Sequence, residues 1–187
     1  MKVNRHTLAE DAYRLHPATY AHSMSGGRWV PYRWSVLLME MLAREIRRRG
    51  ARVVVNAPPR HGKSTVTSEW VPAWYLDNFP EDEVIIACYG DKLARRFGRF
   101  SRDHFRDHPH TWTKLSDDSK SVTDWTTDSG GGMRTTSIGG TVTGTGGRLI
   151  IVDDPHKDWA EAQSEVARQR VIDWFNGTLY SRAEPGA

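Results

Sequence analysis

The chain has 187 residues, of which 38% are apolar, and its 26 Lys and Arg against 23 Asp and Glu give a formal net charge of +3. This length favours one α/β domain and two at most. No apolar run approaches the roughly 18 residues of a membrane-spanning helix, and the first residues lack the apolar core of a secretory signal. The single cysteine, Cys88, excludes an internal disulfide and a thiolate metal site. We therefore expect an intracellular protein without membrane contact, whose isoelectric point near 9.1 is compatible with a polyanionic partner.

The first part of the chain is predicted to be helical. Apolar residues recur at helical spacing over residues 7–24, where Pro17 predicts a kink or a break. A clearer apolar stripe predicts an amphipathic helix over residues 34–49. We expect residues 1–50 to be a lead-in that packs on a core formed by residues 51–187.

A loop suited to phosphate binding follows a β-branched run at residues 53–55, which predicts a strand buried on both faces of a parallel sheet. Residues 57–65, APPRHGKST, match the pattern G-x-x-x-x-G-K-[ST] except that Ala57 replaces the first glycine. In this pattern Lys63 reaches the outer phosphates of a nucleotide and the Ser64 hydroxyl binds Mg²⁺. The residues expected to contact the nucleotide are Pro58, Pro59, Arg60, His61, Gly62, Lys63, Ser64 and Thr65.

The next segments predict a helix over residues 64–76 and a buried strand over residues 84–89, so that the two strands and the helix form a parallel βαβ unit. Asp91 is placed to cap the following helix. One side of that helix is densely basic, which fits three alternatives: contact with phosphates, a face toward a neighbouring subunit, or a solvated surface. The basic residues are Lys92, Arg95, Arg96, Arg99, Arg102 and Arg106.

The middle of the chain is polar and then rich in glycine. Residues 121–127 are compatible with a strand, and apolar residues within 129–147 favour short strands with tight turns over a flexible low-complexity segment. Three histidines lie close together in sequence, but neither a cysteine nor a confident helical pair supports a zinc site. They are His104, His108 and His110.

An acidic pair follows the apolar run at residues 149–152, which predicts a buried central strand. Ligands bind at the carboxyl ends of strands in open α/β sheets, so Asp153 is expected to face Mg²⁺ beside Ser64, as a Walker B aspartate does. Asp154 is then free to orient or deprotonate an attacking water. A turn or a helix cap is the alternative role for such a pair before proline.

Several segments together resemble the ATPase part of the large terminase subunit of tailed bacteriophages. The resemblance is carried by residues 57–64, 139–147 and 149–164, and it is supported by residues 31–34, 84–99 and 171–182. It implies a P-loop NTPase of the RecA-like class, in which helices flank a mainly parallel sheet. It further implies Mg²⁺-dependent ATP hydrolysis that drives double-stranded DNA into a procapsid. The expected partners are the portal protein, the small terminase subunit and further copies in a ring, at the portal vertex in the host cytoplasm.

The resemblance also assigns roles to residues. Asp153 would hold the metal and Asp154 would stand at the position of the catalytic carboxylate, often Glu in related motors, which leaves open whether Glu161 helps. An arginine supplied in cis or by a neighbouring subunit usually completes such a site. The candidates are Arg60, Arg134 and Arg148, of which Arg60 is preferred because it lies within the loop. Any adenine contact in the lead-in is expected from Tyr32 or Trp34.

Other functions remain open at this point. The alternatives are another P-loop NTPase, such as a helicase-like translocase or a small-molecule kinase, and a nucleotide-binding fragment with little turnover. Full-length relatives continue with a coupling strand and a nuclease domain. Because the sequence stops before both, we expect a truncated chain, a split gene or an interrupted reading frame, and no nuclease activity.

Overall fold

Four strands form a mixed sheet in the computed structural model, which describes residues 12–48, 50–119, 121–142, 144 and 146–187. The strands are β1 (Glu83–Cys88), β2 (Asp124–Thr126), β3 (Gly132–Ser137) and β4 (Leu149–Asp153). Their order is β2-β3-β1-β4. β1 runs parallel to β3 and to β4, whereas β2 pairs antiparallel with β3. The protein is thus an α/β protein whose sheet is only partly parallel.

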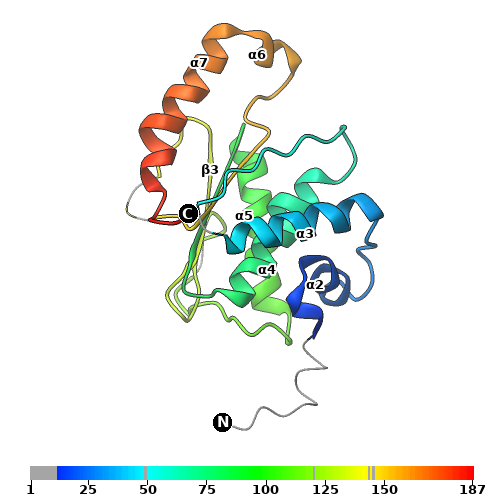
Figure 1. Ribbon diagram of the computed structural model, residues 1–187. Helices are drawn as coiled ribbons and strands as arrows, with labels where there is room; N and C mark the ends of the chain where they lie inside the picture. The colour runs from blue at the N-terminus through cyan, green and yellow to red at the C-terminus, as the bar shows by residue number, and fades with distance from the viewer. Residues whose placement is uncertain (1–11, 49, 120, 143, 145) are drawn as a thin grey trace.

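The helices lie around this sheet as Figure 1 shows. The lead-in contains η1 (Ala12–Leu15), α2 (Pro17–Met24) and α3 (Arg33–Arg47). The loop at residues 57–64 precedes η2 (Thr65–Trp70) and α4 (Val71–Asn78), and α5 (Asp91–Asp107) follows β1. The last elements are α6 (Trp159–Gln163), α7 (Glu165–Trp174), η3 (Phe175–Leu179) and η4 (Tyr180–Arg182). α6 and α7 form an arm that rises above the sheet in Figure 1.

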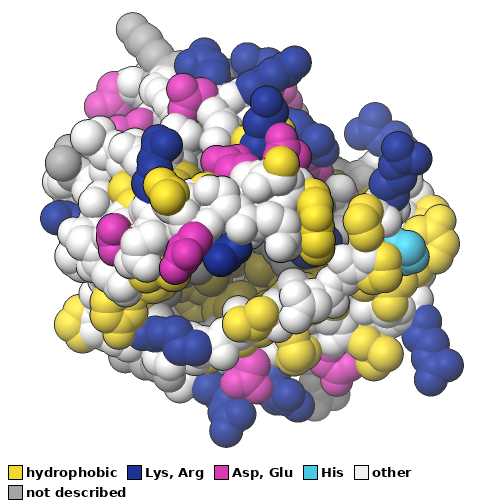
Figure 2. All heavy atoms as spheres, turned by 90° about the horizontal axis from the view of Figure 1, so that it is seen from above, with side chains coloured by type: hydrophobic (Ala, Val, Ile, Leu, Met, Phe, Trp, Pro, Cys, Tyr) yellow, Lys and Arg dark blue, Asp and Glu magenta, His cyan; other side chains and the backbone are white. Residues whose placement is uncertain are grey.

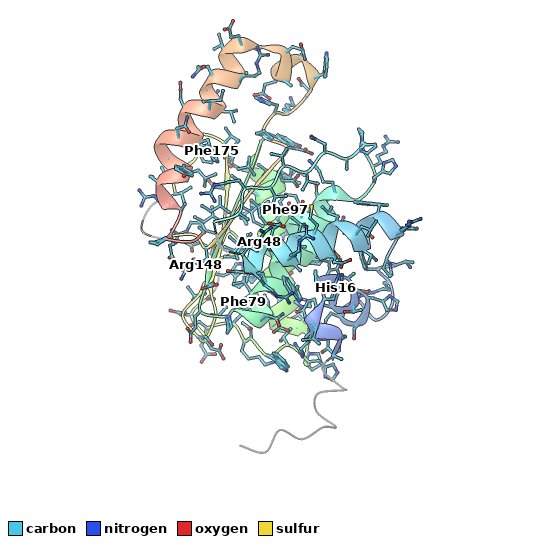
Figure 3. The ribbon with its side chains drawn as sticks, in the orientation of Figure 1. His16, Arg48, Phe79, Phe97, Arg148 and Phe175 are labelled. Atoms are coloured by element: carbon cyan, nitrogen blue, oxygen red, sulfur yellow. The ribbon has the colours of Figure 1, made fainter. Side chains whose placement is uncertain are left out.

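β1 is the centre of the core because both of its faces are covered. Val84, Ile86 and Cys88 belong to a large apolar cluster with side chains of α2, α3, η2, α4 and α5. Ile85 and Ala87 face the other way and pack with Val142, Trp174 and Leu179. Successive side chains of a strand point to opposite faces, so this single run of apolar residues supplies both clusters. Figure 3 shows Phe97 of α5 on the first side and Phe175 beside the second.

The lead-in is fixed to the core by a buried ion pair. The guanidinium of Arg14, which is 3% exposed, pairs with the carboxylate of Asp77 at the end of α4. The indole of Trp74 donates a hydrogen bond to the carbonyl oxygen of Arg14 at 2.7 Å. Because a buried charge is stable only when it is paired and hydrogen-bonded, this contact fixes where η1 meets α4.

The helices of the first half largely agree with the sequence patterns. The amphipathic helix is confirmed as α3, and Pro17 begins α2 after His16, whose ring accepts a hydrogen bond from Ala18 N–H as the N-cap. Residues 7–11 of the predicted first helix lie outside the described residues. Gly90 rather than Asp91 is the N-cap of α5, because Asp91 is the first helical residue and its carboxylate accepts a hydrogen bond from Ser137.

The predicted strand at residues 53–55 is wrong. The segment is extended but unpaired, and Val53 and Val54 are 40% and 86% exposed. A β-branched run favours extended dihedral angles, but a strand also requires a neighbour for its N–H and C=O groups. The hydrogen bonds to a distant segment are made just before this run. Gly50 N–H donates to the carbonyl oxygen of Gly186, and the Arg52 guanidinium donates to that of Ala187.

The predicted βαβ unit is therefore made by other elements: β1, α5 and β3, with the short β2 inserted before β3. Residues 121–127 are confirmed as a strand only over Asp124–Thr126. β4 has the expected direction, but it is an edge strand rather than a central one. Its side chains from Leu149 to Ile151 are accordingly half-buried, and Val152 is 37% exposed.

The described residues contain neither a membrane-spanning helix nor a cluster of metal ligands. No helix among them is long and apolar enough to cross a membrane. No group of three or more His, Cys, Asp and Glu side chains in this part of the chain is arranged to hold a metal ion. His104 instead contacts the hydroxyl of Tyr20 at 2.8 Å and packs edge-on against Trp70.

The buried imidazole of His104 should make stability depend on pH. Burial, followed by His108 and Arg14, lowers the pKa of His104 from 6.5 to about 3. The unfolded chain then binds the proton first, so the free energy of unfolding falls as the pH drops from about 6.5 toward 3. We expect His104→Phe, which keeps an aromatic ring, to flatten this fall in urea unfolding between about pH 7 and pH 5.

A matched control is His61→Phe, because the His61 side chain is exposed. This variant should keep the parental dependence on pH. A His104→Phe protein that loses stability with acid as steeply as the parent would contradict the account of the buried imidazole.

Candidate functional site

The loop at residues 57–64 lies at the start of η2 and has two left-handed residues. Arg60 and Gly62 have φ angles of 63° and 76°. Such angles cost a non-glycine residue free energy and are observed mainly where the fold or a ligand demands them. A Cβ atom at Gly62 would lie 3.9 Å from Cζ2 of Trp34, so the first turn of α3 supports the loop from one side. The backbone is thus held in a curved path that ends at the first turn of a helix.

Lys63 connects this loop to the end of β4. Its ammonium lies 3.2 Å from Oδ1 of Asp153 and contacts Oδ1 of Asp154 directly. Burial alone would lower the pKa of Lys63, but the hydrogen bond to Asp154 and the charge of Asp153 outweigh burial and raise it above its ordinary value. Lys63 is therefore a firmly protonated cation between two carboxylates.

Asp153 is held from two elements. It is 3% exposed, and its Oδ2 accepts a hydrogen bond of 2.9 Å from the Ser68 hydroxyl, which is itself fully buried in η2. Oδ1 remains for Lys63. Two oxygens of one carboxylate thus have different partners, which fixes its orientation.

Asp154 differs from its neighbour in exposure and backbone. Its side chain is 56% exposed, and its φ of 45° lies in the left-handed region. This conformation turns the chain sharply at the carboxyl end of β4, before Pro155 and the arm. The strand end therefore presents one buried and one solvent-accessible carboxylate on either side of Lys63.

The site lies at the upper edge of the sheet in Figure 1, where β4 ends and the arm begins. Figure 2 looks down on this face: apolar side chains line a hollow near its middle, and Lys and Arg side chains gather mostly toward its outline. A helix start with free N–H groups, a lysine and two carboxylates offer donors for an anion and oxygen ligands for a hard divalent cation. These donors are those expected for a nucleotide phosphate with Mg²⁺.

A comparison with protein families identifies the group to which the chain belongs. A family model described as "Terminase large subunit, T4likevirus-type, N-terminal" matches residues 54–184, which is most of the chain. The chain belongs to this terminase family. The role that this family membership gives the chain is phage DNA packaging. No curated protein matches the chain significantly.

Two of the three candidate arginines of the terminase chain lie away from the loop. Arg134, on β3, pairs with both carboxylate oxygens of Asp124 at 2.9 Å. Arg148 immediately precedes β4, so it lies at the end of this strand opposite to Asp153. Its Nε lies 3.1 Å from the carboxylate of Glu184. Figure 3 shows Arg148 below Phe175, on the lower part of the sheet. Arg60 is exposed in the loop and has no ion pair with another described residue.

Glu161 does not join the acidic pair. Its carboxylate accepts a hydrogen bond of 2.7 Å from Lys157 N–H, while its own N–H donates to the Asp158 carboxylate at 2.9 Å. These reciprocal bonds resemble a capping box at the start of α6. The structure thus gives Glu161 a role at the end of a helix.

Ser68 is not among the site residues that the sequence predicts. Ser64, the expected metal ligand, lies immediately before η2, and Ser68 follows it by four residues. Residues four apart share a helix face, and this spacing was the available signal.

The contact between Lys63 and Asp153 should contribute to the free energy of unfolding of the protein without any ligand. Lys63→Met leaves the buried Asp153 carboxylate without its cation, so we expect a lower free energy of unfolding. Asp153→Asn should remove most of that loss in the double variant, with a coupling energy of at least about 0.5 kcal/mol. Urea unfolding of the four proteins without nucleotide or divalent cation measures it.

Lys157→Met is the control, since the Lys157 side chain is exposed. We expect it to leave the unfolding midpoint almost unchanged. Additive effects of Lys63→Met and Asp153→Asn would contradict the observed pairing.

Proposed function

We propose that the chain is the Mg²⁺-dependent ATPase motor part of a phage large terminase, which hydrolyses ATP to move double-stranded DNA into a procapsid. The observation that carries this proposal is the contact of Lys63 with both Asp153 and Asp154. It brings the loop and the end of β4 into one site, although they are 90 positions apart in sequence. The family match supports the packaging role.

In the proposed mechanism the loop binds the phosphates of ATP. Residues 58–65 supply backbone N–H groups and the helix start, whose dipole favours an anion. The ammonium group of Lys63 moves away from the two carboxylates and pairs with the outer phosphates instead. The change is possible because the side chain is 23% exposed at the mouth of the site and its present partners are other ions.

Asp153 and Ser64 are the proposed residues that hold Mg²⁺, and their oxygen atoms suit this cation. Mg²⁺ supplies charge neutralisation at the transferred phosphoryl group. Ser68 keeps Oδ2 of Asp153 occupied, so Oδ1, which now faces Lys63, is the oxygen left for the metal. One carboxylate thereby serves the lysine without nucleotide and the cation with it.

Asp154 is the proposed residue that orients and deprotonates the attacking water. It is released for this task only when Lys63 moves to the phosphates. Arg60 is the proposed arginine that stabilises charge in the transition state, in this chain or in a neighbouring one. Its exposed position in the loop is compatible with both arrangements.

The sheet supports a RecA-like core as part of the same proposal. β1, β3 and β4 are parallel, and the proposed site lies at the carboxyl end of β4, where open α/β sheets bind ligands. The further partners follow from the family: the portal protein, the small terminase subunit and a ring of copies at the portal vertex in the host cytoplasm.

One observation favours a second candidate, a nucleotide-binding fragment with little turnover. Lys63 contacts Asp154, so the proposed catalytic carboxylate is occupied before ATP binds. The family match disfavours an unrelated helicase-like translocase or kinase.

The test is ATP hydrolysis at low and high protein concentration, with and without linear duplex DNA. We expect weak basal hydrolysis that rises on assembly and is abolished by Lys63→Ala and by Asp153→Ala. Asp154→Asn should retain ATP binding but lose about 10²-fold or more in rate, because it removes the base without removing the binding groups.

Glu161→Gln is the matched control, because it changes a carboxylate whose hydrogen bond is to Lys157 N–H at the start of α6. It should hydrolyse ATP at close to the parental rate. Full activity of Lys63→Ala would overturn the proposed phosphate site. ATP binding without turnover under every condition would favour the second candidate.

A further inference from the structure

The outer face of α5 carries a line of cations along the helix. Lys92, Arg95, Arg99, Arg102 and Arg106 follow one another at spacings of three and four residues. This spacing places them on one side of a helix. The opposite side, which includes Ala94, Phe97 and Phe105, is buried in the core.

The line is neutralised at only one end. Arg102 and Arg106 form ion pairs with Asp103, and Arg106 also pairs with Asp107. Arg96, which lies off the line, pairs with Glu69. By contrast, Lys92, Arg95 and Arg99 are exposed and have no ion pair with another described residue. We call these three residues the basic ridge.

The basic ridge extends over eight residues, about 10 Å along the helix axis. It begins just after β1, at the edge of the sheet where β4 and the phosphate loop meet. Asp91, the acidic residue beside it, is engaged by the Ser137 hydroxyl. The ridge therefore presents a regular positive charge to the solvent.

The side chains around the ridge favour a nucleic acid over a protein partner. The core of a protein interface is usually apolar or aromatic. Leu93 and Phe100 of α5 are partly buried against the core, and α5 contributes no large, exposed apolar side chain to the described surface. Contacts to a duplex backbone, in contrast, come largely from Lys and Arg.

We propose that the basic ridge of α5 binds the phosphate backbone of the double-stranded DNA that is packaged. The inference rests on the packaging role proposed above, but it concerns a surface outside the nucleotide site. Three long cations spaced along a helix can neutralise successive phosphates without reading base sequence. The binding should therefore be independent of sequence and sensitive to salt.

The alternative occupant is a second copy of the chain. An exposed acidic segment precedes β3 and would complement the ridge; its carboxylates include Asp117, Asp118 and Asp128. An assembly contact there would also depend on salt. Direct DNA binding and oligomeric state must therefore be measured separately.

The experiment compares Arg95→Gln/Arg99→Gln with Arg44→Gln/Arg48→Gln by titration of a fluorescent linear duplex, without nucleotide, at several salt concentrations. Both variants remove two exposed arginines, but Arg44 of α3 and Arg48, the C-cap of α3, are already paired with Glu45. We expect the ridge variant to bind at least about tenfold more weakly and to lose about two units of the slope of log K against log salt. The control should retain nearly the parental affinity.

Arg95→Lys/Arg99→Lys keeps the charge and should retain most of the affinity, and circular dichroism confirms that each variant is folded. Equal DNA affinity of the ridge and control variants, or no duplex binding by the parent at low salt, overturns the proposal. Unchanged DNA binding with altered sedimentation would assign the ridge to a second copy. Because ATP is absent, a failure of the proposed hydrolysis leaves this result unaffected.

Discussion

The position of Lys63 between Asp153 and Asp154 is the interaction on which the candidate site depends. It joins a loop at the start of η2 to the end of β4, and Ser68 adds a second link between the same two elements. In both links the partner at the end of β4 is a carboxylate, from Asp153 or Asp154. Lys63 offsets one of the two carboxylate charges without a ligand, and when it moves to a phosphate a divalent cation can take its place beside Asp153. The proposed coupling of nucleotide and Mg²⁺ follows from this constraint.

The local patterns of the sequence were sufficient for the parts of the fold that depend on local chemistry. The helix at residues 34–49 and the strand at residues 84–89 were predicted from apolar periodicity, and each is confirmed as α3 and β1. The loop and the acidic pair were also placed together correctly, because the carboxyl end of a parallel strand and the start of a helix lie at the same edge of a sheet. Their roles in catalysis remain predictions.

Pairing between distant segments could not be read from side chains alone. The run at residues 53–55 has the composition of a buried strand but no neighbour for its backbone in the described structure, and the run at residues 149–152 lies at an edge rather than in the centre. In both cases the prediction uses the apolar composition of a run as evidence for a buried, central place in the sheet, which composition alone does not determine. The role of Glu161 in capping α6 was similarly hidden, since it depends on bonds to Lys157 and Asp158 rather than on residue type.

In the proposed site, Lys63 leaves the two carboxylates when nucleotide binds. This movement can be measured by titrating a fluorescent ATP analogue, without Mg²⁺, into the parent protein and into the Asp154→Asn variant. Asp154 competes with phosphate for the lysine, so its neutralisation should tighten Mg²⁺-free binding roughly two- to fivefold, in the range expected for a solvent-exposed ion pair. No binding of the analogue by the parent, or equal or weaker binding by Asp154→Asn, would show that Lys63 does not exchange the carboxylates for phosphate.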